Sequence, residues 1–160
     1  MAQTPAPLIL GWKEWLALPD LGLPAIKVKI DTGAKTSALH AFFIEPFDTA
    51  AAAMVRFGIH PIPGRHHIER LCTAPVVDRR VVMSSSGDRE LRYVIETHLQ
   101  IGDRVWPIEV TLTNREGMAY RMLLGRQALR SGVYIDASAS YLQPKLSYKL
   151  YRPLRRRKPQ

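Results

Sequence analysis

Hydrophobic and polar residues alternate along much of this chain, which is the period-two pattern of β-strands that bury one face. Alternation, or a high content of β-favouring residues, predicts strands at 26–30, 36–44, 54–59, 76–83, 91–101 and 105–113. Two short apolar runs, 122–125 and 133–136, predict two more strands. Residues 126–131, which are followed by Gly132, predict one short helix.

Turn residues separate the predicted strands. Gly102-Asp103 joins two alternating runs and predicts a hairpin. Residues 84–88, Ser-Ser-Ser-Gly-Asp, predict another turn. Many strands with a single short helix predict an all-β fold that closes into a barrel.

The length of 160 residues predicts one domain, 1–150, followed by a basic, disordered tail at 151–160. The single cysteine, Cys72, has no internal disulfide partner. The sequence shows neither a signal-peptide pattern nor the roughly 20 consecutive apolar residues that a membrane helix needs. We therefore expect a cytoplasmic protein without a membrane segment.

The net charge is +9, and five cations lie at 152–158. Such a charge run has two interpretations: a solvated chain end, or a weak electrostatic contact with RNA, the ribosome or an acidic protein. No nucleic-acid-binding motif accompanies it, so the charge bears on location rather than on activity.

The candidate chemistry lies in Asp31-Thr32-Gly33-Ala34, directly after the run 26–30. A carboxylate at the end of a strand, followed by a hydroxyl, a glycine and a small residue, is how an aspartic protease presents its catalytic group. The motif occurs once, so a second chain must supply the second carboxylate. The alternative is an ordinary turn, in which Asp, Thr and Gly are all common.

This motif and Leu123-Leu124-Gly125-Arg126 together resemble the retropepsin-type aspartic proteases. The closer resemblance is to a bacterial and archaeal family often labelled "ATP-dependent zinc protease", whose pattern extends over most of the chain. Matching segments lie at 11–15, 18–22, 29–40, 79–82, 85–87, 111–115 and 122–126.

The resemblance implies a retropepsin-like fold and a homodimeric aspartic endopeptidase, with Asp31 of each chain catalytic and water as the nucleophile. Two carboxylates in such a pair share one proton, so one accepts a proton from water while the other donates to the peptide carbonyl. Thr32 is implied to hydrogen-bond across the dimer axis, and Gly33 and Ala34 to complete the tight loop.

The second motif is implied to support that loop. Leu123 and Leu124 would pack beneath it, and Gly125 would permit close approach. In viral retropepsins an acidic residue after the first motif pairs with the arginine after the second, whereas Lys35 and Arg126 are both cations. We interpret this difference as selectivity for glutamate-rich peptides.

Further cations are candidates for the same cleft. The predicted substrate-binding residues are Lys35, Arg79, Arg92 and Arg115. The alternative is that the arginines pair with Glu90, Glu96 and Glu109. The first candidate for a mobile flap over the cleft is the punctuated segment 61–72, and the second is the hairpin 84–90.

No metal or organic cofactor is expected. His-Glu-x-x-His, paired cysteines and the phosphate-binding Gly-x-x-x-x-Gly-Lys-Ser/Thr loop are all absent from the sequence, so ATP would act through a partner. Folding could still gather His40 with other histidines, but we expect His40 to be a hydrogen-bonded strand residue. Cys72 is expected at a half-buried apolar position rather than as a catalytic thiol.

The resemblance also implies a partner. The family is associated with a glutamate ligase that adds glutamate tails to a small-subunit ribosomal protein, which implies proteolytic trimming or regulation of that system. The strongest alternative is a non-enzymatic retropepsin-like module that binds the ligase or the ribosome. A zinc peptidase is the third class, and metal analysis would distinguish it.

Overall fold

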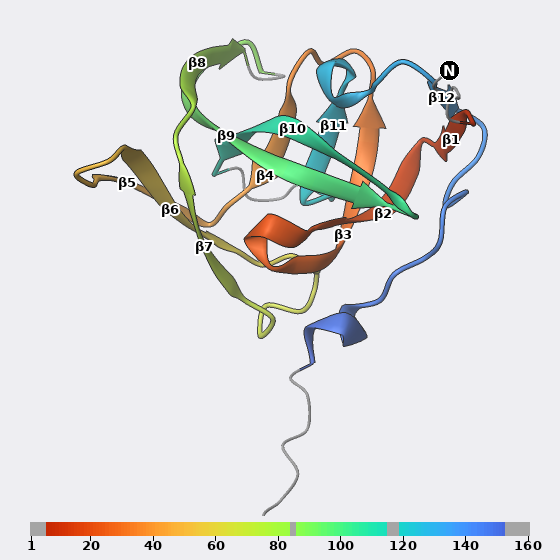
Figure 1. Ribbon diagram of the computed structural model, residues 1–160, viewed down its shortest axis with the longest axis horizontal. Coiled ribbons are helices and arrows are strands. Elements are labelled where there is room, and N and C mark those ends of the chain that lie inside the picture. The colour runs from red at the N-terminus through yellow and green to blue at the C-terminus, as the bar shows by residue number, and fades with distance from the viewer. Residues whose placement is uncertain (1–5, 84–85, 115–118, 153–160) are drawn as a thin grey trace, which may run out of the picture.

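The computed structural model describes residues 6–83, 86–114 and 119–152, and most of them lie in β-strands (Figure 1). The strands are β1 (Leu8–Gly11), β2 (Lys13–Leu18), β3 (Leu23–Asp31), β4 (Ser37–His40), β5 (Phe43–Asp48), β6 (Ala53–Ile59), β7 (Arg70–Pro75), β8 (Asp78–Met83), β9 (Arg89–Ile101), β10 (Arg104–Thr113), β11 (Met122–Gly125) and β12 (Val133–Asp136). Three short 3₁₀ helices are η1 (Pro19–Leu21), η2 (Arg126–Ala128) and η3 (Tyr148–Tyr151).

The largest sheet closes on itself. Its strand order is β10-β4-β11-β3-β2-β9-β8, and β10 also pairs with β9, so all of these strands except β8 form a ring. A second sheet contains β5, β6 and β7, and β1 pairs in parallel with β12. The prediction of an all-β fold is confirmed.

The core follows from the predicted alternation. In β10, Trp106, Ile108, Val110 and Leu112 all point inward and are buried. The predicted hairpin at Gly102 is also present, since Ile101 pairs with Arg104 across the turn. Gly102 has φ 59°, a left-handed conformation that glycine adopts without strain.

Three predicted elements differ from the structure. The run 36–44 divides into β4 and β5, which belong to different sheets, and β7 occupies part of the segment 61–72 that was the first flap candidate. The predicted helix 126–131 is only the three-residue η2. Its first two N–H groups, those of Arg126 and Gln127, donate to Ala34 O and Lys35 O, which ties this segment to another loop.

Cys72 is buried in β7, and its thiol donates to Leu21 O (3.4 Å). Burial raises the pKa of the thiol to about 11. A buried, protonated thiol is a poor nucleophile, so the expectation that Cys72 is a packing residue agrees with its surroundings.

Tyr151 shows that the folded part of the chain continues past residue 150. Its side chain is buried, its hydroxyl donates to Ala25 O, and burial raises the pKa of that hydroxyl to about 12. Tyr151, which the prediction placed in the tail, thus packs against the folded domain, and the disordered tail itself stays a prediction. Residues 153–160, which carry most of the charge of the predicted tail, lie outside the described residues.

Of the helices in the described ranges, none is long and apolar enough to cross a membrane.

Candidate active site

The Asp31 loop begins where two parallel strands end. β3 runs into Asp31, and β11 lies beside it with Gly125 opposite Asp31. Ala34 N donates to Asp31 O (3.1 Å), which closes a turn. Gly33 N donates to Asp31 Oδ1 (3.1 Å), and this bond orients the carboxylate.

The Leu-Leu-Gly-Arg motif holds this loop in place. An added Cβ at Gly125 would lie 2.6 Å from the backbone of Thr36, so only glycine permits this approach. Arg126 N donates to Ala34 O (2.9 Å), and its guanidinium donates to Gly33 O (3.2 Å) and more weakly to Thr32 O (3.4 Å). Gly125 on β11 and Arg126 on η2 therefore hold the loop without the acidic partner found in viral enzymes.

The two leucines of the motif have different surroundings. Leu124 is fully buried, as expected for a residue beneath the loop. Leu123 is half-buried and lines a cavity together with Asp31. The motif thus contributes both support and part of the wall of the site.

The sequence motif implied that Gly33 is needed for a tight turn, but its surroundings indicate a different role. Its φ is not in the left-handed region, and an added Cβ would meet one atom within 4 Å, Asp31 Oδ1 at 3.3 Å. The turn itself therefore accepts a side chain, and the glycine leaves space for the carboxylate.

Asp31 faces a cavity of about 770 Å³, which is large enough for several residues of a peptide. The cavity is lined by Asp31, Gly33, Ala34, Lys35, Thr36, Ala38, Arg80, Val81, Val82, Met83, Arg92, Leu123 and Gln127. Val81 and Met83, on the strand that leads into the β8–β9 turn, are 63% and 64% exposed.

The residues that line this cavity can be compared with the two predicted flap segments. The segment 61–72 contributes nothing to the described lining of the Asp31 cavity, and Ile62 and Ile68 anchor it in the core. Figure 1 shows the β6–β7 loop at the lower edge of the molecule and the end of β3 at the upper edge. Val82 and Met83, which directly precede the second candidate, 84–90, line the cavity, whereas residues 84–85 lie outside the described residues.

The cations of the site fall into two groups. Lys35 lines the cavity and is exposed, and it forms no ion pair within the described part of the chain. Arg92 also lines the cavity but is 5% exposed and pairs with Glu90 (3.1 Å). The alternative predicted for the arginines therefore holds for Arg92.

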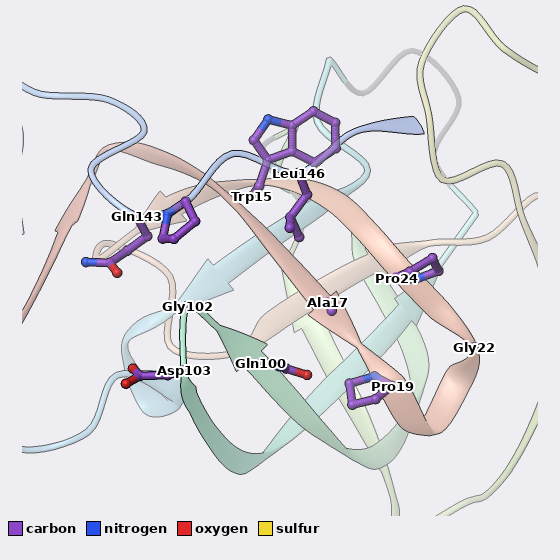
Figure 2. A pocket seen from close by; sticks show the side chains of 11 residues that line it. Trp15, Ala17, Pro19, Gly22, Pro24, Gln100, Gly102, Asp103, Gln143 and Leu146 are labelled. Atoms are coloured by element: carbon purple, nitrogen blue, oxygen red, sulfur yellow. The ribbon is translucent and has the colours of Figure 1, made fainter. Parts of the chain in front are cut away.

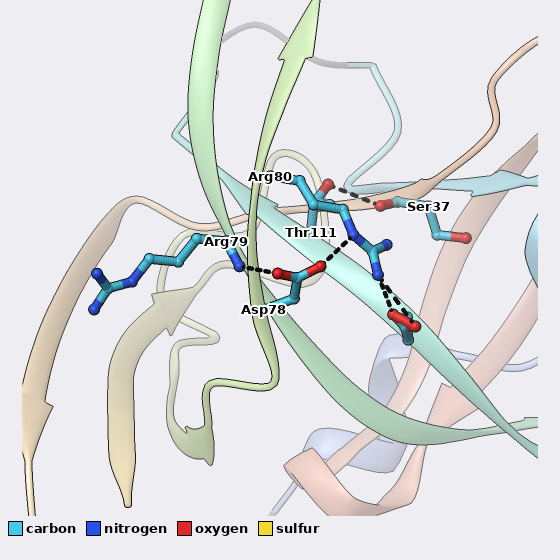
Figure 3. A network of polar contacts seen from close by, with 6 residues as sticks. Ser37, Asp78, Arg79, Arg80 and Thr111 are labelled. Carbon is cyan, nitrogen blue, oxygen red and sulfur yellow. Dashed lines mark hydrogen bonds and ion pairs between the residues drawn. The ribbon is translucent and has the colours of Figure 1, made fainter.

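Arg80, which sequence reasoning did not select, also lines the cavity. Its guanidinium forms ion pairs with Asp78 (2.8 Å) and Glu109 (2.7 Å), and Figure 3 shows it directed toward Asp78 while the Arg79 side chain points away. The two hydrogen-bonded carboxylates raise the pKa of Arg80, and Arg80 in turn lowers the pKa of Asp78. Neighbouring residues on a strand face opposite sides of the sheet. This alternation could have indicated that only one of Arg79 and Arg80 points toward the cavity. Arg115 lies outside the described residues.

The histidines are dispersed. His40 is buried in β4, His60 stacks between Phe42 and His66, and His98 binds Asp20 (2.7 Å). Within 6–83, 86–114 and 119–152, no three His, Cys, Asp or Glu side chains are grouped as metal ligands would be.

Comparison with known proteins agrees with this geometry. Residues 9–146 match the model of the RimB-like family, described as retropepsin-like aspartic endopeptidase RimB. A solved Legionella pneumophila protein of unknown function (DUF785) is 28% identical, with a TM-score of 0.69, over 84% of this chain and 97% of that one.

Two curated relatives are named probable alpha-L-glutamate ligase. The one from Shewanella pealeana is 47% identical over 83% of this chain and 29% of its own length. The one from Parasynechococcus marenigrum is 45% identical over 92% of this chain and 33% of its own length. The chain thus spans about a third of these relatives. The family model covers most of this chain, and the family resemblance found in the sequence is confirmed: the chain belongs to the RimB-like family and has its retropepsin-like fold.

Proposed function

We propose that this protein is an aspartic endopeptidase that works as a homodimer, with one catalytic Asp31 from each chain. The observation that carries the proposal is the Asp31 carboxylate, oriented by Gly33 N–H within a cavity of about 770 Å³. The second motif supports the loop from beneath, as a catalytic loop requires.

The proposed chemistry needs two Asp31 side chains close enough to share a proton. The ionised carboxylate accepts a proton from water, whose oxygen then bonds to the peptide carbonyl carbon. The protonated carboxylate donates to the carbonyl oxygen. Collapse of this tetrahedral species breaks the C–N bond, and the amine leaves with a proton from the pair. Thr32 is exposed beside Asp31, so it is available to bind the partner's loop.

We further propose a glutamate-rich substrate, such as the tail that a glutamate ligase adds to a ribosomal protein in the cytoplasm. The support is twofold. Lys35 is an exposed cation in the cavity, whereas Arg126 is engaged by backbone carbonyls and Arg92 by Glu90. The curated relatives carry the name of a glutamate ligase.

The direct test is to incubate the full chain with a peptide that ends in a glutamate tail and to identify products by mass spectrometry. Because two chains build one site, activity per chain should rise with protein concentration until the dimer is saturated. Binding of the peptide without cleavage at any concentration would overturn this proposal in favour of the non-enzymatic module that binds the ligase or ribosome.

Lys35→Glu tests the substrate class. Reversing one charge within the cavity should lower kcat/KM for a glutamate-rich peptide by roughly tenfold or more, because attraction becomes repulsion at short range. A peptide with glutamine in place of glutamate should lose far less. Lys149→Glu, at another exposed lysine, is the matched control. An equal loss on both peptides would show that Lys35 does not select acidic substrates.

A further inference from the structure

Lysines continue the charge of the site along the outer face of β3. Side chains two apart on a strand share a face, so Asp31, Lys29 and Lys27 point the same way. The register of β2 adds Lys13 opposite Lys29 and Trp15 opposite Lys27. Leu123, which lines the Asp31 cavity, is the partner of Lys29 on the other side. This basic face is therefore continuous with the candidate active site.

A single tyrosine gathers three ammonium groups at the far end of this face. The Nζ atoms of Lys13, Lys145 and Lys27 lie 5.2, 5.5 and 5.8 Å from the centre of the Tyr141 ring. Lys13 also lies over Trp12 (4.7 Å) and Lys27 over Trp15 (5.3 Å). Cation–π contacts offset part of the repulsion among the lysines, and the ammonium groups stay near the surface.

Tyr141, whose ring the three lysines surround, has an unfavourable backbone conformation. Its φ of 54° is in the left-handed region, which is unfavourable for a residue other than glycine. Two anchors fix it. Tyr141 N donates to Lys13 O (3.0 Å), and the fully buried Glu14 carboxylate accepts from Leu142 N (2.9 Å) and Gln143 N (3.1 Å).

A cavity of about 430 Å³ opens beside these lysines. Its described lining contains no acidic residue and includes Lys13, Lys27, Trp15, Tyr120, Tyr141 and Leu146. Trp15 and Leu146 also border a neighbouring cavity of about 710 Å³, and Figure 2 shows the two side chains at its rim. The cavity therefore combines lysines with aromatic and aliphatic walls.

We propose that Lys29, Lys27 and Lys13 form a second binding site for the acidic part of an extended peptide substrate. The site leads from Asp31 along β3 to the cavity beside Tyr141. Alternate side chains of an extended peptide lie about 7 Å apart, and so do Lys29 and Lys27 on β3, so carboxylates of the peptide match the lysines in spacing as well as in charge. The inference rests on the proposed function and adds to it a reason for preferring long glutamate tails.

Peptide is favoured over single-stranded nucleic acid by two observations. The lysines follow one strand that ends at the candidate catalytic carboxylate, and both Lys13 and Lys27 already cover aromatic rings on which bases would stack.

The test measures binding, so it does not depend on turnover. In an Asp31→Asn background, the affinity for peptides with a short and a long glutamate tail is measured by fluorescence anisotropy. The long tail should bind more tightly, and Lys27→Gln combined with Lys29→Gln should weaken its binding by about tenfold and remove the dependence on length. Lys13→Gln, in a separate variant, should weaken it by a smaller factor. Thermal unfolding of each variant establishes that it is folded.

The matched control is Arg56→Gln combined with Arg130→Gln, which removes the same charge from residues outside both cavities of the proposed site, each a cation that also lies over a ring. An equal loss of affinity in this control would show that only net charge matters and would overturn the proposal. Tighter, lysine-dependent binding of a single-stranded oligouridylate would also overturn it. Length-dependent peptide binding without cleavage by the parent chain would instead contradict the endopeptidase, not the lysine site.

Discussion

Asp31→Asn is expected to lower kcat/KM for peptide hydrolysis by about a thousandfold or more. An asparagine pair has no proton to share and no group that can accept a proton from water, so both halves of the acid–base step are lost. Asp31 is half-exposed, and its carboxylate accepts one hydrogen bond from within the loop, so the fold should tolerate the change. Asp136→Asn, which removes a carboxylate from another turn, is the control for the change in charge.

Mixing the two chains makes this test sharper. In an equal mixture of parent and Asp31→Asn chains that exchange freely, only about a quarter of the dimers carry two Asp31 residues. Total activity should therefore fall to about a quarter of that of the same number of chains in parent dimers. Activity near one half would mean that each chain acts alone, and unchanged cleavage by Asp31→Asn would exclude the mechanism.

Gly125→Ala is expected to destabilise the fold by about 3 kcal/mol, in the range of severe overpacking. The new Cβ would lie 2.6 Å from both Thr36 C and Thr36 O and 3.0 Å from Ala34 O. These are backbone atoms of the Asp31 loop, so relief requires β11 to move away from it. The free energy of unfolding in urea measures the loss, and peptide cleavage should fall with it because the loop loses its support.

Gly33→Ala is the matched control for this prediction. Its Cβ would meet only the Asp31 carboxylate, at 3.3 Å, and its backbone conformation suits alanine. Stability should change by less than about 1 kcal/mol, while activity falls because the carboxylate is displaced. A Gly125→Ala protein as stable as the parent would show that the close approach of β11 to the loop is not required.

The sequence predicted features that depend on nearby residues. The long strands β9 and β10 and their Gly102 turn follow from local alternation, and Asp31 follows from a four-residue motif. β7 was missed because its neighbours are rich in proline and polar residues, although its own residues alternate between buried and exposed.

Features that depend on distant partners could not be predicted. Arg80 binds Glu109 only because β8 and β10 flank β9, and local pattern carries no such information. Glu14 is an acidic residue yet fully buried, because its side chain accepts hydrogen bonds from Gly11 N and from two backbone N–H groups 128 and 129 residues away. The ring of strands creates both environments.

The pairing of β3 with β11 also has a consequence for biosynthesis. The Arg126 guanidinium binds the carbonyl of Thr32 across 94 residues of sequence, so the Asp31 loop lacks its support until most of the chain has left the ribosome. Contacts this far apart form late because a long loop must close first. A nascent chain would thus carry the Asp31 motif for some time before the loop gains its support.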